Sequence, residues 1–530
     1  MLIKNGGRKV KKNMKRLVAT GMTVATMMNL VACGNSNSSS SSSNGEVTKP
    51  DQFSVMVNST VVTESNGGKD FYNYLASLTD LDIKWIRPDH SGYYDAVANA
   101  FNSEETMPDV VLLSSDYYAL YASNGFLWNM TDAWKNSDLV KSGRLVNGYE
   151  STINNLYANG EDGEKAMYGF SSTRGDGCVT YVKQAWLEAA GIPVSDVENV
   201  TMDFNTYYNY LKKMAEVKGH YVISAPGFIQ PSEPYTNYLP EFYQQAHYTF
   251  YQNDAGEYVD GFSETAMKDA LTRINTAIND GVIDRETVNN STSNARDKFY
   301  SKDASSESGV FTYWSGTWAN TLSTMLESKG LDGRLIAIKP VTELGAYTQR
   351  NPGIWAITSA AKNPEGIFKY FLESMLDGGD VQTAWEYGAK GTHWDTKAET
   401  VTVKDKDTTY EEGTFHMLPQ PENPTTLMQK NNIDPLLALA KFKDADPGIE
   451  TISKVARDNS EFFFENCQGY NVLPMTTDLS ECITDINTAR NYVISQVGLG
   501  YMTVDEGMEY YNNTVGSYVT TVLKSLNKAK

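Results

Sequence analysis

The chain has few of the side chains on which most catalytic and metal sites depend. It has four cysteines and five histidines in 530 residues. No two histidines have the i, i+4 spacing of a zinc-binding helix. The G-x-S-x-G, H-E-x-x-H, Walker and G-x-G-x-x-G motifs are absent, and Ser359–Lys362, an S-x-x-K sequence, lacks its S-D-N and K-T-G partners. We therefore expect the chain not to be an enzyme.

Basic residues and long apolar runs are also scarce. The chain has 65 acidic and 45 basic residues, a net charge of −20. This excess of acid argues against a nucleic-acid partner, because such binding depends on clustered Lys and Arg. No apolar stretch approaches the roughly 18 residues that a membrane-spanning helix needs. With 41% hydrophobic residues, however, the chain can still bury a sizeable core.

The N-terminal region has the opposite charge. Residues 1–32 include seven basic and no acidic side chains, and the apolar run Leu17–Leu30 follows the basic part. This order predicts a secretory signal peptide over residues 1–32, starting at Met1 or Met14. Its removal would change the net charge from −20 to −27, so the acidity belongs to the exported body.

Leu30-Val-Ala-Cys33-Gly resembles the bacterial lipobox, in which a cysteine receives a lipid before cleavage. The resemblance implies lipidation of Cys33, palmitate included, and anchoring at the extracellular face of the cell membrane of a Gram-positive-type envelope. Residues 33–49 are rich in Ser and Asn, which predicts a flexible linker after the anchor.

Three cysteines remain after Cys33, and none has C-x-x-C spacing (Cys178, Cys467 and Cys482). Cys467 and Cys482 could form a disulfide, or all three could be free thiols. We expect no cofactor and no metal, although an acid-rich chain leaves a structural Ca²⁺ open.

The first third of the body alternates strand-like and helix-like segments. Strands are expected at Gln52–Asn58, Leu81–Ile86 and Pro108–Leu113, with helices at Phe71–Leu78 and Tyr93–Phe101. This order predicts an α/β sheet. Ligands of such sheets bind beyond the carboxyl ends of the strands. The candidates at those ends are Ser59, Thr60, Glu64, Asp89, Ser115 and Asp116.

Several motifs occur in the order typical of one family. They include Pro108-Asp-Val-Val, the stretch Tyr121–Thr131, Tyr168-Gly-Phe and Gly391-Thr-His-Trp394. Together they resemble extracellular solute-binding protein family 1, the lipoprotein branch that serves ABC importers of oligosaccharides. The resemblance extends over about residues 50–520.

This resemblance implies a periplasmic-binding-protein-like fold of type 2, with two α/β lobes, hinge-forming crossing strands and a ligand cleft between the lobes. The first lobe would contain residues 50–172 and about 350–395. The second would contain residues 173–349 and about 396–530, including C-terminal helices. Helical spacing also predicts helices at Ala266–Ile278 and Ile367–Leu376.

Aromatic and cationic residues near the expected cleft are the remaining ligand candidates. Phe311–Trp318 is predicted to be a strand that leads into a helix capped by Ser315 or Thr317. Rings there could stack on a sugar, and an arginine could donate to sugar oxygens or to a carboxylate. For every tryptophan, core packing is the alternative. The candidates are Arg174, Trp314, Trp318, Trp355 and Trp394.

We therefore expect a monomeric, lipid-anchored receptor that binds a carbohydrate, in particular an oligosaccharide, and delivers it to ABC permease subunits. A peptide or acidic-sugar ligand in the same class of receptor is an alternative. A surface glycoside hydrolase or lyase is another, because 65 acidic residues neither reveal nor exclude a catalytic carboxylate pair.

Overall fold

The computed structural model describes residues 47–142, 150–229, 236–403, 406–421, 424–425, 441–442, 444–446, 454–470, 473–474 and 476–528. The predicted signal peptide, Cys33 and the linker up to residue 46 lie outside these ranges. Among the described residues, no helix has both the length and the hydropathy needed to span a bilayer.

The first lobe is built on a five-stranded sheet with the order β2-β1-β3-β13-β6. Strands β1, β2 and β3 are parallel, and β13 is antiparallel to both of its neighbours. All four residues of β3 are buried, as its continuous apolar sequence predicts. The strands are β1 (Phe53–Met56), β2 (Ile83–Ile86), β3 (Val110–Leu113), β6 (Gly169–Phe170) and β13 (Ile354–Ile357).

Helices pack around this sheet. Two of them, α2 and α3, confirm the helices predicted between the first three strands. The helices of this lobe include α2 (Gly68–Thr79), α3 (Tyr93–Ala100), α4 (Ser115–Ser123), α5 (Thr131–Lys135), α6 (Asp138–Ser142), α7 (Glu150–Asn155) and α15 (Asp380–Tyr387).

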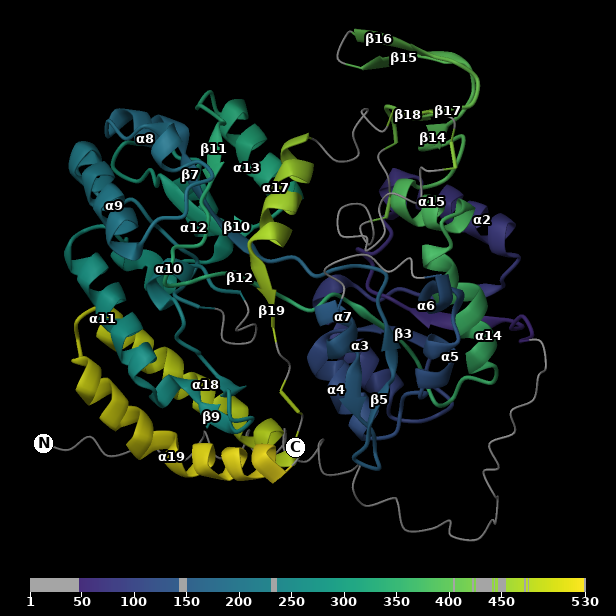
Figure 1. Cartoon of the computed structure of the whole chain (residues 1–530), viewed down its shortest axis with the longest axis horizontal. Helices are drawn as coiled ribbons and strands as arrows, with labels where there is room; N and C mark the ends of the chain where they lie inside the picture. The colour runs from purple at the N-terminus through teal and green to yellow at the C-terminus, as the bar shows by residue number, and fades with distance from the viewer. Residues whose placement is uncertain are drawn as a thin grey trace, which may run out of the picture.

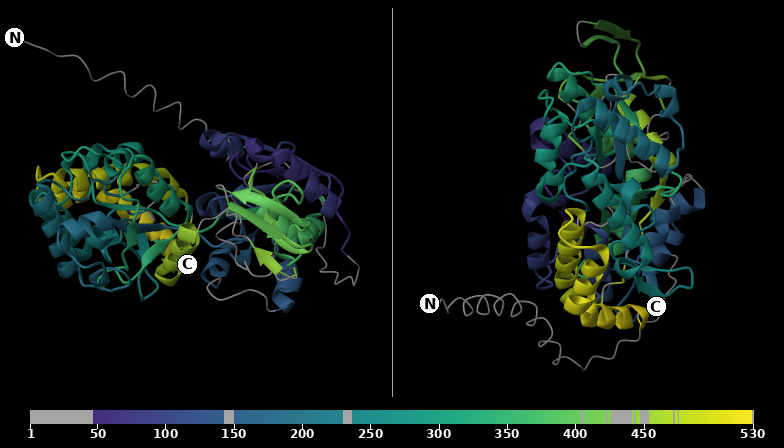
Figure 2. Two further views of the ribbon diagram at one scale, coloured as in Figure 1. Left: turned by 90° about the horizontal axis from the view of Figure 1, so that it is seen from above. Right: turned by 90° about the vertical axis from the view of Figure 1, so that its left-hand side faces the viewer.

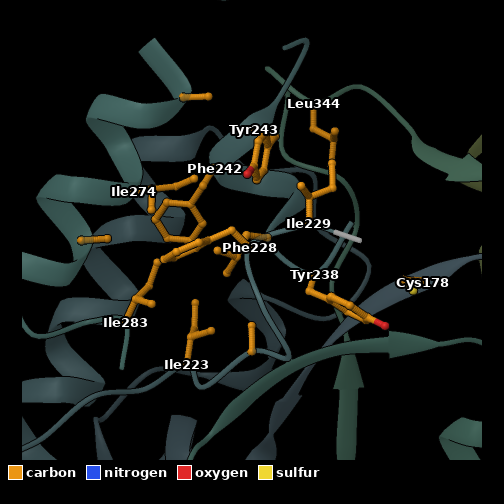
Figure 3. Close-up of a cluster of buried hydrophobic side chains, with 14 of the residues drawn as sticks. Cys178, Ile223, Phe228, Ile229, Tyr238, Phe242, Tyr243, Ile274, Ile283 and Leu344 are labelled. Carbon is orange, nitrogen blue, oxygen red and sulfur yellow. The ribbon is translucent and has the colours of Figure 1, made fainter. Parts of the chain in front are cut away.

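The second lobe contains an antiparallel sheet with the order β10-β7-β11. Helix α11 confirms the prediction for Ala266–Ile278, and Figure 3 shows part of the core, where Ile274 lies near Phe242 and Phe228. The strands are β7 (Cys178–Lys183), β10 (Val310–Trp314) and β11 (Leu335–Ala337). The helices include α8 (Gln184–Ala189), α9 (Phe204–Lys218), α10 (Pro240–Tyr243), α11 (Thr265–Asn279), α12 (Thr292–Phe299), α13 (Thr317–Ser328), α17 (Lys454–Glu465), α18 (Thr477–Gly498) and α19 (Val504–Lys528).

The two lobes have separate hydrophobic cores. One core draws on residues 53–170 and 354–385, and the other on residues 178–347 and 463–526. Figures 1 and 2 show the lobes side by side, joined by chain segments that cross between them. The predicted two-lobe α/β fold is therefore confirmed.

The described residues between 394 and 446 cluster with the first lobe, whereas the sequence predicts that residues from about 396 onwards belong to the second. The Trp394 ring lies 6.5 Å from the Tyr74 ring of α2, and the Thr425 hydroxyl donates to the Trp385 carbonyl at 2.7 Å. The position of this segment is therefore determined by contacts, such as that between Trp394 and Tyr74, between residues far apart in the sequence. The segment contains β14 (Trp394–Asp395), β17 (Thr414–Met417) and β18 (Asp444–Asp446), and a hairpin of β15 (Glu399–Val403) and β16 (Lys406–Tyr410) that projects from the body in Figure 1.

Two local predictions need correction. The N-cap of α13 is Gly316, with φ of +66°, and neither Ser315 nor Thr317. Glycine adopts this backbone conformation without a steric penalty, so the chain turns there without a side-chain cap. The predicted helix at 367–376 is irregular: α14 (Pro364–Ile367) passes into a π-turn, Phe368–Leu372, and then a 3₁₀ turn, Glu373–Leu376.

Candidate functional site

The segments that cross between the lobes lie close together. Residues 171–177 connect β6 to β7, and β12 (Tyr347–Gln349) is followed by a segment that enters β13. The Arg350 amide donates to the Asp176 carbonyl at 3.0 Å, and the Gln349 side chain donates to the Gly175 carbonyl at 3.1 Å. A Cβ at Gly175 would lie only 1.6 Å from the Arg350 carbonyl oxygen. Glycine at this position therefore allows the two crossing segments to approach each other.

A third segment joins this region. Strand β19 (Cys467–Gly469) pairs in parallel with β12, and the Tyr470 amide donates to the Gln349 carbonyl at 3.0 Å. The amide side chain of Asn155, in α7 of the first lobe, donates to Asn351 and to the Tyr470 carbonyl at 2.5 and 3.2 Å. These bonds connect the first lobe to the crossing segments.

Arg350 bridges the crossing segments and the second-lobe sheet. Its Nε lies 2.6 Å from Oδ1 of the buried Asp176, and its guanidinium lies 4.6 Å from the centre of the Trp314 ring. The ion pair with Arg350 compensates the charge of Asp176. The ring of Trp314, which the Arg350 guanidinium covers, is only partly buried.

Arg174 is held differently, because it has a ring neighbour but no acceptor. Its guanidinium lies 3.6 Å from the centre of the Phe464 ring of α17. Its Nε is buried and has no hydrogen-bond partner. Burial lowers the pKa of Arg174, while the nearby Cys467 and Glu461 raise it. Within the described ranges, this guanidinium is therefore close to the crossing but is not paired with an anion.

Helix α17 also closes one end of α13. The Gly316 amide donates to Asn459 Oδ1 at 2.7 Å, and the Tyr181 hydroxyl donates to the same oxygen at 2.9 Å. Trp318, in the first turn of α13, lies edge-on to Tyr313 at 4.9 Å, and Arg296 lies 5.0 Å from its ring centre. Trp318 is partly exposed, so its ring can still offer surface to a ligand.

The candidates from the first-lobe strand ends make contacts within that lobe. Arg87 pairs with Glu64 at 2.7 Å and donates to the Ser59 carbonyl at 3.3 Å. Thr60 donates to Asn58 at 2.5 Å. The Asp89 carbonyl accepts from the Gly92 amide at 3.1 Å. Ser115 and Asp116 begin α4, where Asp116 is exposed.

Two of the predicted tryptophans belong to the core. Trp355 is 0% exposed and packs edge-on against Phe371 and Trp385. Trp394 is 1% exposed and donates to the Gly388 carbonyl at 2.9 Å. Neither ring has a free face for a sugar, and core packing, the alternative that the sequence left open, describes both.

A pocket of about 620 Å³ lies between the lobes. Its walls come from α7 and the β4–β5 hairpin (Tyr157–Asn159 and Lys165–Met167) of the first lobe, from the loop after α10 and the β8–β9 hairpin (Phe250–Gln252 and Tyr258–Asp260) of the second, and from β12 and β19. In Figure 1, β5 and β9 lie below the crossing strands, whereas α13 and α17 lie above them. Cys178, which lines the pocket, is paired with Trp314 in the second-lobe sheet, so this tryptophan candidate lies beside a pocket-lining strand.

The pocket wall combines ring faces with amides. The His247 ring stacks on Tyr251 at 3.7 Å, and the Tyr251 hydroxyl is held by Glu264 at 3.1 Å. The side chains of Asn154, Gln244 and Gln468 make no hydrogen bond to other residues in the described part of the chain. Rings suit the apolar faces of a polyhydroxylated molecule, and amide side chains suit its hydroxyl groups.

Sequence reasoning missed these pocket residues. Asn154, Gln244 and Gln468 come from three distant segments, and none belongs to a recognisable motif. The cluster Tyr248-Thr-Phe-Tyr251 was the only local signal, because it is rich in aromatic residues.

The cysteines and acidic residues that the structure describes form no further centre. None of the three described cysteines, Cys178, Cys467 and Cys482, is in a disulfide, and burial raises the pKa of Cys467 to about 11. No group of three or more His, Cys, Asp or Glu side chains able to hold a metal was found among the residues that the structure describes.

Comparisons with known proteins add the fold relationship. No family model and no curated protein matches the sequence. Solved structures do match. The N-glycan transport solute-binding protein NgtS from Streptococcus pneumoniae aligns with a TM-score of 0.58 and 15% identity, over 91% of this chain and 99% of that one.

The chain has the fold of the two-lobe solute-binding proteins. An HMO-binding, ABC-transporter-associated solute-binding protein from Bifidobacterium longum infantis gives a TM-score of 0.56 at 16% identity, covering 90% of this chain and 98% of that chain. The alginate-binding protein AlgQ2 gives 0.54 at 16%, covering 91% and 98%. Each match extends over both lobes.

Proposed function

We propose that this protein is a lipid-anchored solute-binding protein that captures a carbohydrate, in particular an oligosaccharide, between its lobes and delivers it to the permease of an ABC importer. The observation that carries the proposal is the arrangement between the lobes. The partly exposed Trp314 and Trp318 belong to a turn that bonds to the crossing segment, and a pocket lined with rings and amides lies between the lobes. Solved proteins of the same fold include several named for sugar or glycan binding.

In the proposed function, the protein binds its ligand and does not change it chemically. A receptor of this class closes by rotation of the lobes about the crossing segments, because a ligand that contacts both lobes favours the arrangement in which both contacts are made. We propose that it acts as a monomer and without a cofactor.

A thermal-shift screen with an oligosaccharide panel tests this function. A matching sugar should raise the melting temperature, because binding to the folded state alone adds about 2.7 kcal/mol at a hundredfold excess over Kd. Chromatography should recover the sugar unchanged.

Trp318→Ala should weaken binding by about 1 to 3 kcal/mol if the ring stacks on the ligand. Trp85→Ala, on the sheet edge farthest from the crossing, is the control. Cleavage of the sugar would refute the receptor proposal.

The membrane anchor is tested separately. We expect a labelled fatty acid to be incorporated into the full-length protein in a Gram-positive host and not into a Cys33→Ala variant. Cys482→Ala, which removes another thiol, should leave the labelling unchanged. Equal labelling of the wild type and Cys33→Ala would contradict the anchor.

A further inference from the structure

Arg174 has no anionic partner among the residues that the structure describes, although it lies at the place where the lobes meet. It lies on the segment that links β6 of the first lobe to β7 of the second. Its Nε is buried without an acceptor, and the ring of Phe464 covers one face of its guanidinium at 3.6 Å. Removing a charged donor from water without supplying an acceptor is unfavourable, so such a group calls for an explanation.

The neighbouring arginine shows what Arg174 lacks. Arg350, on the adjacent crossing segment, lies over Trp314 in the same manner, but its charge is compensated by Asp176 at 2.6 Å. No carboxylate within the described residues pairs with Arg174 in this way. Glu461, an exposed residue of α17, raises the pKa of Arg174 by its charge, but no ion pair joins the two residues.

Other hydrogen-bonding groups nearby are also unused. The hydroxyl of Ser172, two residues before Arg174, is buried without a partner, and so is the hydroxyl of Ser460. Ser460 and Phe464 are four residues apart in α17, so they share a helix face, and that face carries the Arg174 guanidinium. The unused groups can all donate hydrogen bonds, and they would be satisfied by an acceptor.

We propose that Arg174 binds a carboxylate of the ligand, so that the saccharide is an acidic one containing uronate residues. This inference rests on the proposed function and specifies its substrate class. A guanidinium held flat by an aromatic ring presents its edge to a carboxylate in the bidentate geometry that arginine favours. Arg174 would also provide local positive charge in a protein whose overall charge would repel an anionic ligand.

Calorimetric titration of the full chain with short uronate oligomers, each beside its neutral hexose counterpart, tests this proposal. The wild type should bind a uronate oligomer, with an affinity that falls as salt rises. Arg174→Gln should weaken that binding by roughly 10- to 100-fold. Arg174→Lys should weaken it by less, because lysine keeps the positive charge but lacks the planar pair of N–H donors that binds both carboxylate oxygens. Arg334→Gln, which removes an exposed cation paired with Asp332, should leave the affinity within about twofold.

Contrary outcomes separate the two proposals. Binding of neutral but not acidic oligomers, or of a sulfated oligomer alone, would overturn the uronate inference and leave the receptor function intact. An unchanged uronate affinity in Arg174→Gln would also overturn it. If no saccharide of any kind binds, the proposed function itself fails. The melting temperature of unliganded Arg174→Gln should stay close to that of the wild type, because the substitution removes the contact with the Phe464 ring but also relieves the burial of an unpaired charge.

Discussion

Replacing Arg490 with methionine is expected to lower the free energy of unfolding by about 3 to 5 kcal/mol, because it leaves a buried carboxylate without its counter-ion. Arg490 is 0% exposed. Its Nη2 lies 2.8 Å from Asp260 Oδ1, and its Nε donates to the Tyr511 hydroxyl at 3.3 Å. Urea unfolding followed by tryptophan fluorescence measures the loss.

The surroundings of Arg490 explain why the loss should be large. Four aromatic rings surround the guanidinium, at 4.8 to 6.0 Å from its carbon. Water therefore cannot solvate Asp260 once the cation is removed. The double variant Arg490→Met/Asp260→Asn should regain at least half of the lost stability. Arg334→Met, at an exposed pair, should leave the free energy of unfolding nearly unchanged. A similarly small effect of Arg490→Met would contradict the proposed role of the pair.

This ion pair also supports the inter-lobe pocket. Asp260 ends β9, Arg490 belongs to α18, and two of the rings around the guanidinium, Tyr248 and Phe250, line the pocket. The C-terminal helix pair thus fixes one wall of a cavity whose other walls come from the first lobe and the crossing strands.

Much of the first lobe could be predicted from sequence because its signals are local. The alternation in β1, the continuous apolar run of β3 and the helical spacing of α2 are each contained within a dozen residues. The position of the described residues between 394 and 446 could not be predicted in this way. It depends on contacts such as Trp394 with Tyr74, which are 320 residues apart and leave no periodic trace.

The candidate site shows the same division. The sequence places Trp314 and Trp318 at a strand-to-helix turn, and the structure shows that turn. Trp355 and Trp394 also lie in family-like motifs, but both are buried. The sequence could not show this, because a motif does not reveal which side of the backbone faces the core. The sequence could propose Arg174 as a donor. Only the fold shows that it lies on Phe464, 290 positions further along the chain, without an acceptor.

Glu241→Gln is expected to stabilise the protein by about 3 kcal/mol at pH 8 and to have little effect near pH 4.5. Glu241 lies in α10, is 1% exposed and has Tyr347 Oη 3.4 Å from its Oε1. Burial raises its pKa from 4.5 to about 7, opposed by hydrogen bonds from Thr180 and Tyr347. Between these two values the folded protein retains a proton that the unfolded chain has lost. The free energy of unfolding must therefore fall as the pH rises through this window.

Glutamine resembles the protonated acid but cannot ionise, so the variant should lack this loss. Urea unfolding of both proteins at pH 4.5, 6 and 8 measures the difference, with Glu509→Gln, at an exposed position of α19, as the control. If the free energy of unfolding changed with pH in the same way in the wild type and in Glu241→Gln, the predicted effect of the buried Glu241 carboxyl would be contradicted. Tyr347 belongs to crossing strand β12, and the Ile338 carbonyl, at 2.7 Å from its hydroxyl, competes with Glu241 for the single hydroxyl proton. Ionisation of Glu241 would thus place an uncompensated charge beside a segment that connects the lobes, so the alkaline loss of stability should originate at the hinge.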